Sequence, residues 1–576
     1  MRADAGSDIV DATQPAPDVL VDPTRFVLPH GVHRVWPANP SSAFTLRGGT
    51  YVGAMRITSR GEEEILVVGA TGFVAALDPD TGALRWSVQI PVPAGLEMAL
   101  LSPPAIVENH LVVSYQFGND VERTAHLLSV IDLDARALDP AYRTLELTAS
   151  VPDNEGHALV TFRPAFALSR AALEHVRDTD GHDLVYASFG NLRDIQPWHG
   201  WVFEIDLQKW RSRGPSAAIT GVLLTTPESD CGAENESGAR DTTCGGGVWS
   251  PSGVRAFTRP DGSYDLLVPT GNGELDLTRH DYANSILRTS RGLRFDPECD
   301  PTACASFRPS LPAVTCLESC RNLLVPHLLA NDPPYRPGSG SCEGRSLLDC
   351  YAALDLDFGS SSPAVLDVGA RGRALLYPAK DGALYLADYD HLGRLYDRMQ
   401  IAGPCGSSDS QCTAEWAGMF VTEPVVTTLN GEPVALVQSF VPDGVHAAGM
   451  TAVRVSTDDG VVALQRLWSA PASDSPDALR YFRLHPSRIG LGTIDDEQYA
   501  WVVDVVPGGA ADAHGRLFGV RVRDGAIVAE TTMLGGGQRF TVPLVDGRRV
   551  IVVSTNGGEA IVEAYEPDDS FDVDDP

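Results

Sequence analysis

The chain has 576 residues, and 44 basic against 76 acidic side chains give it a formal net charge of −32 at pH 7. This charge repels the phosphates of nucleic acids and anionic lipid surfaces, so both are excluded as partners. The hydrophobic content of 43% is ordinary for a globular chain with a core. No apolar run approaches the ~18 residues that a membrane-spanning helix needs.

The first 22 residues are polar and rich in Pro and Ala, which predicts a disordered linker. Met1 is followed by RADAGSD, which lacks the apolar core of a secretory signal. Because the cysteines described below indicate export, we expect that a signal segment has been removed. The protein would then be periplasmic, secreted or anchored to the outer membrane by a lipid. Residues 26–36 are expected to form a strand that pairs with the last strands of the chain.

Residues 69–86 read GATGFVAALDPDTGALRW and predict a β-hairpin. Apolar side chains alternate from Phe73 to Leu77, Asp78–Gly82 has the composition of a tight turn, and the second strand contains Trp86. Looser copies occur at 128–133, 202–207, 285–288, 383–388, 452–455, 517–522 and 560–565. A repeat of roughly 45 to 75 residues matches propeller blades, which need about 40 to 50 residues each. We therefore expect an all-β, eight-bladed β-propeller over residues 23–567; the alternative is an array of β-sandwiches.

Two stretches depart from this repeat in the first half of the chain. Residues 169–176 are predicted to form a short helix on a loop, ahead of a clear strand at 183–190. Residues 191–201 read NLRDIQPWHGW. We interpret Trp198, His199 and Trp201 in this stretch as a packed loop with a structural histidine.

The cysteines form five close pairs in irregular sequence, at variable spacings that do not match a zinc site. No Cys-x-x-Cys-His is present, which excludes covalent c-type haem. We expect disulfides between sequence neighbours, which implies an oxidising compartment. Residues 296–350 hold six of them and are predicted to be a Cys/Pro-rich insertion that caps one face of the ring, whereas residues 568–576 are predicted to be a disordered acidic tail. The ten are Cys231, Cys244, Cys299, Cys304, Cys316, Cys320, Cys342, Cys350, Cys405 and Cys412.

Four short motifs follow one another in the middle of the chain: GGVW at 246–249, TGN at 270–272, LDLD at 354–357 and KDG at 380–382. Their order, together with the repeated hairpin, resembles the quinoprotein alcohol dehydrogenase-like β-propeller superfamily, whose enzymes carry pyrroloquinoline quinone (PQQ). The resemblance implies that the Trp that closes a hairpin docks against the neighbouring blade. It also implies a cofactor site assembled on the central face of the ring.

Each motif then implies a role for one residue. Trp249 would stack under the quinone, the Asn272 amide oxygen would bind Ca²⁺, and Lys380 would bond the quinone oxygens. Asp355 would take the alcohol proton and bind the metal, with Asp357 as the alternative base. Asp194 is the nearest candidate for a further metal carboxylate. Ca²⁺ prefers hard oxygen ligands of this kind.

The expected activity is PQQ- and Ca²⁺-dependent oxidation of a small-molecule alcohol, with electrons passed to a separate acceptor protein. The chain departs from the resemblance in having no adjacent Cys–Cys pair, no Glu at the metal position, and Leu354 where an aromatic often precedes the Asp. Some members of the superfamily lack the site, so the alternative is a cofactor-free module that binds or assembles cell-envelope proteins. The pair Asp355 and Asp357 would also suit a glycosidase.

Overall fold

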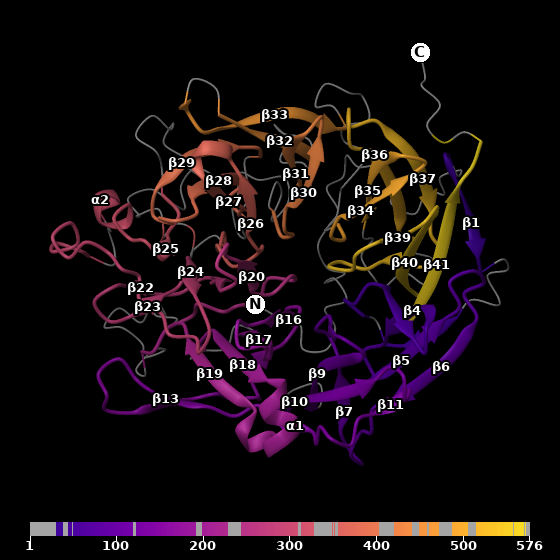
Figure 1. Cartoon of the computed structure of the whole chain (residues 1–576), viewed down its shortest axis with the longest axis horizontal. Coiled ribbons are helices and arrows are strands. Elements are labelled where there is room, and N and C mark those ends of the chain that lie inside the picture. Colours follow the sequence, from indigo (N-terminus) through magenta and orange to yellow (C-terminus); the bar gives the residue numbers. More distant parts are fainter. Residues whose placement is uncertain are drawn as a thin grey trace.

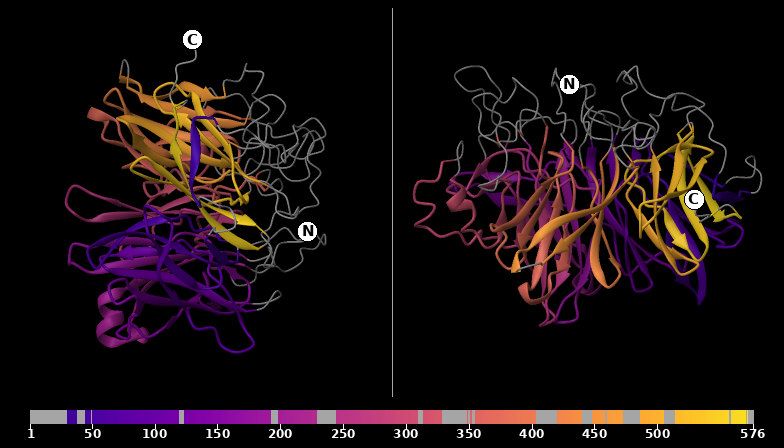
Figure 2. Two further views of the ribbon diagram at one scale, coloured as in Figure 1. Left: turned by 90° about the vertical axis from the view of Figure 1, so that its right-hand side faces the viewer. Right: turned by 90° about the horizontal axis from the view of Figure 1, so that it is seen from above.

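The computed structural model describes residues 30–37, 44–48, 50–118, 123–191, 198–228, 244–308, 313–327, 348, 351, 355–402, 420–439, 448–457, 460–471, 486–504, 514–556, 558–569 and 571. In this part of the chain, eight antiparallel sheets of at least four strands surround one axis (Figure 1). Seen from two further sides, the eight sheets form a single disc (Figure 2). The prediction of an all-β, eight-bladed propeller is confirmed.

The first four blades extend from residue 55 to residue 324. Blade 1 contains β3 (Met55–Ser59), β4 (Glu62–Val68), β5 (Phe73–Leu77) and β6 (Leu84–Gln89). Blade 2 contains β7 (Glu97–Ala99), β8 (Ala105–Val107), β9 (His110–Gly118), β10 (Arg123–Asp132), β11 (Ala137–Leu138) and β12 (Leu145–Glu146). Blade 3 contains β15 (Ala167–Leu168), β16 (Glu174–Arg177), β17 (Asp183–Asn191), β18 (Trp201–Asp206) and β19 (Ile219–Leu224). Blade 4 contains β20 (Arg255–Thr258), β21 (Tyr264–Pro269), β24 (Ile286–Thr289) and β25 (Leu323–Leu324).

The last four blades complete the ring. Blade 5 contains β26 (Ala364–Asp367), β27 (Arg373–Pro378), β28 (Ala383–Asp388) and β29 (Leu395–Gln400). Blade 6 contains β30 (Val425–Leu429), β31 (Glu432–Ser439), β32 (Gly449–Ser456) and β33 (Ala463–Ala470). Blade 7 contains β34 (Gly490–Ile494), β35 (Glu497–Asp504), β36 (Arg516–Arg521) and β37 (Ile527–Thr532). Blade 8 contains β38 (Gly536–Gly537), β39 (Leu544–Asp546), β40 (Arg549–Asn556), β41 (Glu559–Pro567), β1 (Val32–Trp36) and β2 (Thr45–Arg47).

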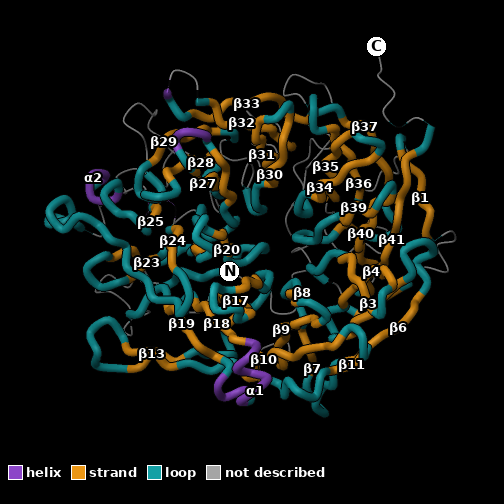
Figure 3. The backbone as a smooth tube through the Cα atoms, viewed as in Figure 1, coloured by secondary structure: helices purple, strands orange, loops and turns teal. Residues whose placement is uncertain are grey.

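Few elements stand outside the blades. Two small hairpins are β13 (Ser150–Pro152) with β14 (Leu159–Thr161), and β22 (Leu275–Asp276) with β23 (Asp281–Tyr282). The helices among the described residues are short: α1 (Leu207–Arg213), α2 (Val314–Leu317), η2 (Pro215–Ala217) and η3 (Gly369–Arg371). They lie at the rim, whereas strands fill the ring (Figure 3). No helix in the described part of the chain is long and apolar enough to span a membrane.

The hydrophobic core is divided among the contacts between blades. The described core residues form eight clusters, each shared by two neighbouring sheets. On β4, Leu66 and Val68 pack toward blade 2, whereas Ile65 and Val67 pack toward blade 8. Successive side chains of a strand point to opposite faces, so a blade that is buried on both faces needs continuous apolar strands.

The N-terminal segment closes the ring. Strand β1 pairs antiparallel with β41, so that Val32 lies opposite Pro567 and Arg34 lies opposite Tyr565. Strand β2 pairs with the other end of β41. The expected closing strand is therefore present at 32–36, and the last blade takes strands from both ends of the chain.

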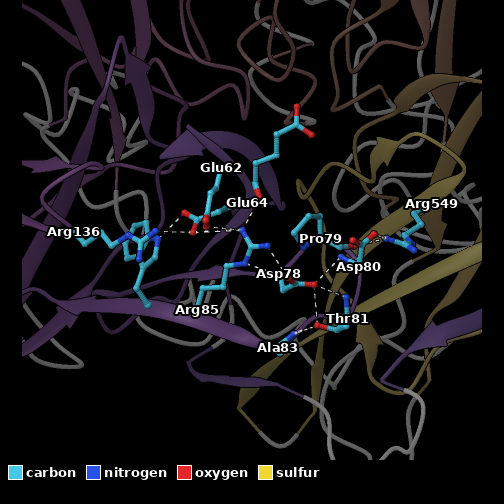
Figure 4. A network of polar contacts seen from close by, with 12 residues as sticks. Glu62, Glu64, Asp78, Pro79, Asp80, Thr81, Ala83, Arg85, Arg136 and Arg549 are labelled. Carbon is cyan, nitrogen blue, oxygen red and sulfur yellow. Dashed lines mark hydrogen bonds and ion pairs between the residues drawn. The ribbon is translucent and has the colours of Figure 1, made fainter. Parts of the chain in front are cut away.

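The hairpin at 69–86 joins three blades, as Figure 4 shows. Asp78 Oδ1 accepts the backbone N–H groups of Asp80 and Thr81 at 3.0 and 2.9 Å, which fixes the turn. Arg136 of blade 2 pairs with the buried Glu64 at 3.1 Å, and Trp86 Nε1 donates to the same carboxylate at 2.6 Å. Arg549 of blade 8 bonds Asp80 on the other side at 2.8 Å.

The aromatic docking that the family resemblance implies recurs around the ring. Gly82 has φ +69°, and a Cβ there would lie 2.5 Å from the ring of Trp36 in blade 8. Gly525 of blade 7 has φ +78° and would meet Trp468 of blade 6 at 2.6 Å. In both places the turn glycine supplies a positive φ and also a flat surface for the indole of the preceding blade.

The prediction of a helix at 169–176 is wrong. Residues 174–177 form β16, which pairs with β17, and blade 3 instead carries α1 after β18. Asp206 caps α1 by accepting the backbone N–H of Lys209 at 2.8 Å. Pairing with β17 outweighs the helical composition of SRAALEHV, because tertiary context overrides local propensity.

Pairing of neighbouring cysteines is also wrong where it is described. Cys299 bonds Cys320 and Cys304 bonds Cys316, so the two disulfides are nested around α2. Cys244 is disulfide-bonded as well. The described part of the insertion that contains α2 lies at the outer rim of the ring (Figure 1). Cys231, Cys342, Cys350, Cys405 and Cys412 lie outside the described residues, as do 328–347 of the predicted cap.

Candidate functional site

The hub, meaning the inner edge of the ring, is built from one position repeated in every blade. A buried hydroxyl residue stands at the inner edge of each blade, near its first strand, and each is at most 2% exposed. The eight are Thr50, Ser102, Ser169, Ser250, Ser361, Thr422, Ser487 and Thr541. The Oγ atoms of Ser102 and Ser169 lie 2.6 Å apart, and Ser361 Oγ donates to the Thr422 carbonyl at 2.8 Å. These bonds join one blade to the next, so residues beside them are held rigidly near the axis.

Trp249 and Asn272 come together in blade 4 because glycine lets two backbone segments touch. Gly245 has φ +69°, and a Cβ there would lie 2.0 Å from the Asn272 carbonyl oxygen. Gly246 N donates to the same oxygen at 2.7 Å, and Gly271 N donates to Gly247 O at 2.9 Å. The GGVW and TGN motifs are thus two sides of one backbone contact.

Blade 5 brings three more of the predicted residues to the same place. Lys380 Nζ lies 3.1 Å from Asp355 Oδ1 and 2.5 Å from Asp357 Oδ2. It also lies 4.8 Å from the centre of the Trp249 ring, and Trp249 Nε1 donates to Asp357 Oδ1 at 3.0 Å. Trp249, Asn272, Asp355, Asp357 and Lys380 therefore form one contiguous group, which we call the hub cluster.

Lys380 is unusual in this sequence. Only two of the 44 basic residues are lysines, the other being Lys209, so arginine is the rule elsewhere. Burial lowers the pKa of the Lys380 ammonium, but Asp355 and Asp357 more than offset this, and its pKa is raised above the ordinary value. A compact ammonium can reach two carboxylates and an aromatic face at once, which a planar guanidinium does not do in the same space.

The two aspartates differ in what remains available to a ligand. The Asp357 side chain is 3% exposed, and its oxygens accept from Trp249, Lys380 and, at 3.0 Å, the Gly359 N–H. Burial raises the pKa of Asp357, and Lys380 opposes that rise. The Asp355 side chain is 40% exposed and accepts from Lys380 and, at 3.1 Å, from Asn272 Nδ2. Asp355 therefore faces open space, whereas Asp357 is a structural anchor.

Asn272 offers a second oxygen atom that can still accept a hydrogen bond or bind a metal. Its Oδ1 is buried and has no hydrogen-bond partner among the described residues. The bond from Nδ2 to Asp355 fixes which atom of the amide is the oxygen. An unpaired buried carbonyl next to a carboxylate is a donor set that suits Ca²⁺. These two residues are therefore compatible with the metal that the family resemblance implies, and they supply two of its roughly six to eight ligand groups.

A second group of hub residues was not predicted from the sequence. Arg170 of blade 3 lies with its Cζ 5.8 Å from the Trp249 ring and 5.9 Å from the Phe540 ring of blade 8. Arg539 lies 5.4 Å from the Phe540 ring, which packs edge-on against Tyr51 at 5.5 Å. Blades 3 and 8 are not neighbours, so this array of cations and aromatic rings crosses the axis. The signal was an aromatic directly before a hub hydroxyl, since Phe540-Thr541 repeats Trp249-Ser250.

The remaining predicted residues lie apart from the hub cluster or outside the described residues. Asp194 lies outside the described residues. His199 Nδ1 is 2.5 Å from the Thr226 carbonyl oxygen, and burial lowers its pKa to about 4. A histidine that stays neutral and donates to a backbone carbonyl fits the interpretation of a structural side chain.

Neither a protein-family model nor a curated protein sequence matches the chain. Solved structures do match. The quinohemoprotein alcohol dehydrogenase ADHIIG from Pseudomonas putida HK5 aligns over 91% of this chain and 75% of its own, with a TM-score of 0.52 and 13% identity. A europium-containing methanol dehydrogenase aligns over 92% and 93%, with a TM-score of 0.50 and 13% identity. BamB from Moraxella catarrhalis aligns over 93% and 99%, but its TM-score of 0.42 is too low to carry an argument. The chain has the eight-bladed fold of the quinoprotein alcohol dehydrogenase-like β-propellers.

Proposed function

We propose that this chain is an exported PQQ- and Ca²⁺-dependent alcohol dehydrogenase that passes electrons to an external acceptor. The observation that carries the proposal is the hub cluster, in which five residues from four separate motifs meet and the buried Asn272 Oδ1 has no described partner. Nested disulfides support an oxidising compartment.

The residues have complementary tasks in this proposal. Asn272 and Asp355 would hold the metal, and the part-exposed indole of Trp249 would support a planar ring system. PQQ carries three carboxylates, and Lys380, Arg170 and Arg539 bring three cations to the hub of a chain whose net charge is −32. Bound PQQ and Ca²⁺ would supply the two-electron oxidation of an alcohol.

Asp355 is the proton acceptor in this arrangement. Its carboxylate is exposed on one side and held by Lys380 and Asn272 on the other, so an alcohol hydroxyl can reach it. Asp357 is the weaker candidate for that role because its side chain is 3% exposed and already accepts from Trp249, Gly359 and Lys380.

A second candidate function is a cofactor-free propeller that binds or assembles envelope proteins. The observation that favours it is the closed set of ion pairs in the hub cluster, where Lys380 is already matched by two carboxylates. In that case the cluster would only stabilise the contact between blades 4 and 5.

The two candidates are separated by reconstitution. Purified full-length chain is mixed with PQQ and CaCl₂, freed of unbound cofactor by gel filtration, and assayed for bound chromophore and for dye reduction with primary and secondary alcohols. The enzyme is expected to retain PQQ in a Ca²⁺-dependent way and to reduce the dye. Asp355→Ala should lose turnover by at least about 10²-fold with unchanged circular dichroism, whereas Asp390→Ala, at an exposed carboxylate of the same blade, should not. Absence of PQQ retention at any Ca²⁺ concentration would refute the enzyme and favour the binding module.

A further inference from the structure

The described anchors of the segment that carries Asp355 lie on both sides of that residue. Residue 357 and those after it are fixed by the core, since Phe358 N donates to Asn284 Oδ1 at 3.2 Å and Gly359 packs against Gly271. Asp355 itself is part-exposed and has φ +57°, a left-handed conformation that a non-glycine residue keeps only when its surroundings impose it. Something on the N-terminal side must therefore hold this backbone.

Tyr351 provides that anchor in two ways. Its carbonyl accepts the Leu356 N–H at 2.8 Å, which ties Tyr351 to the residue directly after Asp355. Its hydroxyl donates to Asp381 Oδ2 at 2.6 Å, and both side chains are 0% exposed. The segment is thus fastened to blade 5 at a buried carboxylate.

Asp381 is the sequence neighbour of Lys380. The two stand in the turn between β27 and β28, where Gly382 N donates to Ala379 O at 3.0 Å and Gly382 takes φ +71°. Lys380 extends to the hub cluster, whereas Asp381 extends into the blade and accepts from Tyr351, from Tyr385 at 2.5 Å and from Arg398 at 3.3 Å. One turn therefore carries both Lys380 and Asp381. Asp381 anchors the segment of Asp355, and Asp355 is the carboxylate that pairs with Lys380.

We propose that Tyr351 and Asp381 are positioning residues, whose buried hydrogen bond sets Asp355 against Lys380. The bond links the end of the 296–350 insertion to the hub cluster, because Tyr351 directly follows that segment. It acts on Asp355 and not on Asp357, whose Oδ1 is held by Trp249 of blade 4 and by the Gly359 N–H. The proposal concerns the ion pair itself, and it stands whether or not the chain binds PQQ.

The chain offers a matched control. Tyr385 donates to the same Asp381 oxygen as Tyr351 and is equally buried, but it belongs to β28 and does not touch the 351–357 segment through any described hydrogen bond. Tyr351→Phe and Tyr385→Phe each remove one hydroxyl from one acceptor. A merely structural role would give the two variants the same effect on the hub cluster.

The test measures the coupling between Asp355 and Lys380. Asp355→Asn, Lys380→Met and the double variant form a double-mutant cycle in the full-length chain, and urea unfolding gives the coupling energy of this pair. The cycle is measured in the wild-type background, in Tyr351→Phe and in Tyr385→Phe. In Tyr351→Phe the coupling should fall to less than half of its wild-type value, because Asp355 has moved away from Lys380.

The expected pattern is a smaller coupling energy in Tyr351→Phe and an unchanged one in Tyr385→Phe. Equal coupling energies in Tyr351→Phe and Tyr385→Phe would overturn the proposal. If Tyr351→Phe does not fold, Asp381→Asn is measured against Tyr385→Phe with the same two outcomes.

Discussion

At the scale of single residues, Asp281 on β23 is a buried carboxyl group whose environment opposes ionisation. Burial raises its pKa from the ordinary 3.8 to about 7, with Glu274 and Asp276 adding to the rise and Arg279 opposing it. Among the described residues, its oxygens accept hydrogen bonds from Glu228 N at 3.2 Å and Asn154 Nδ2 at 3.4 Å. These contacts do not compensate for burying a negative charge.

The folded chain should therefore hold this proton at a pH where the unfolded chain has lost it. As pH rises from about 4 to 7, the Asp281 contribution should reduce the free energy of unfolding by up to a few kcal/mol, at about 1.4 kcal/mol per pKa unit. Asp281→Asn should remove this dependence and stabilise the protein at pH 8. Its new amide could donate to the buried Asn154 Oδ1, which has no described partner, after that side chain flips. Urea unfolding at pH 4.5 and pH 8 measures the difference, and a variant with an unchanged pH slope contradicts the assignment.

The hub cluster shows which site residues the sequence motifs could predict and which they could not. The motifs named Trp249, Asn272, Asp355, Asp357 and Lys380, and the structure brings all five together. The motifs could not rank the two aspartates, because the ranking depends on the 3% and 40% exposures of their side chains. They also missed Arg170 and Arg539, because the local signal, an aromatic before a hub hydroxyl at Phe540-Thr541, does not reveal a contact across the axis.

At the scale of elements, period-two alternation and turn composition were sufficient to predict the hairpins. They failed at β16, where pairing to β17 overrides a helical composition, and at the cysteines, because a nested connectivity depends on the turn that α2 makes. The packing of Trp36 on Gly82 joins β1 of blade 8 to the β5–β6 turn of blade 1, and this contact can be tested separately.

Gly82→Ala should destabilise the protein in two ways. A Cβ at φ +69° is strained, and it would also meet the Trp36 ring at 2.5 Å. Gly61 in the same blade has φ +79° but no atom within 4 Å, so Gly61→Ala isolates the strain, which costs about 1–2 kcal/mol. We expect Gly82→Ala to lose about 1–3 kcal/mol more than Gly61→Ala in urea unfolding. Equal losses would mean that the indole moves aside and that its docking contributes little.

At the scale of the whole molecule, the ring is held shut by strands from the two ends of the chain. Each of the other seven blades is built from one continuous stretch, but blade 8 needs β1 beside β41. Val32 and Trp36 are 0% and 3% exposed and belong to two different clusters between blades, 7–8 and 8–1. Closure therefore completes two of the eight contacts between blades at once.

Removal of residues 1–36 should open this joint, whereas removal of residues 1–22 should not, because the shorter deletion leaves β1 intact. Loss of two buried apolar side chains and the β1–β41 pairing should reduce the free energy of unfolding by about 5 kcal/mol or more. The newly exposed edge of β41 should also promote association between chains, since an unpaired strand edge is a template for pairing. Urea unfolding and light scattering on the two deletions, measured at one protein concentration, give both readouts. If both deletions unfold at the same urea concentration and remain monomeric, then the other six contacts between blades and β2 are enough to hold the ring, and β1 contributes little to its stability.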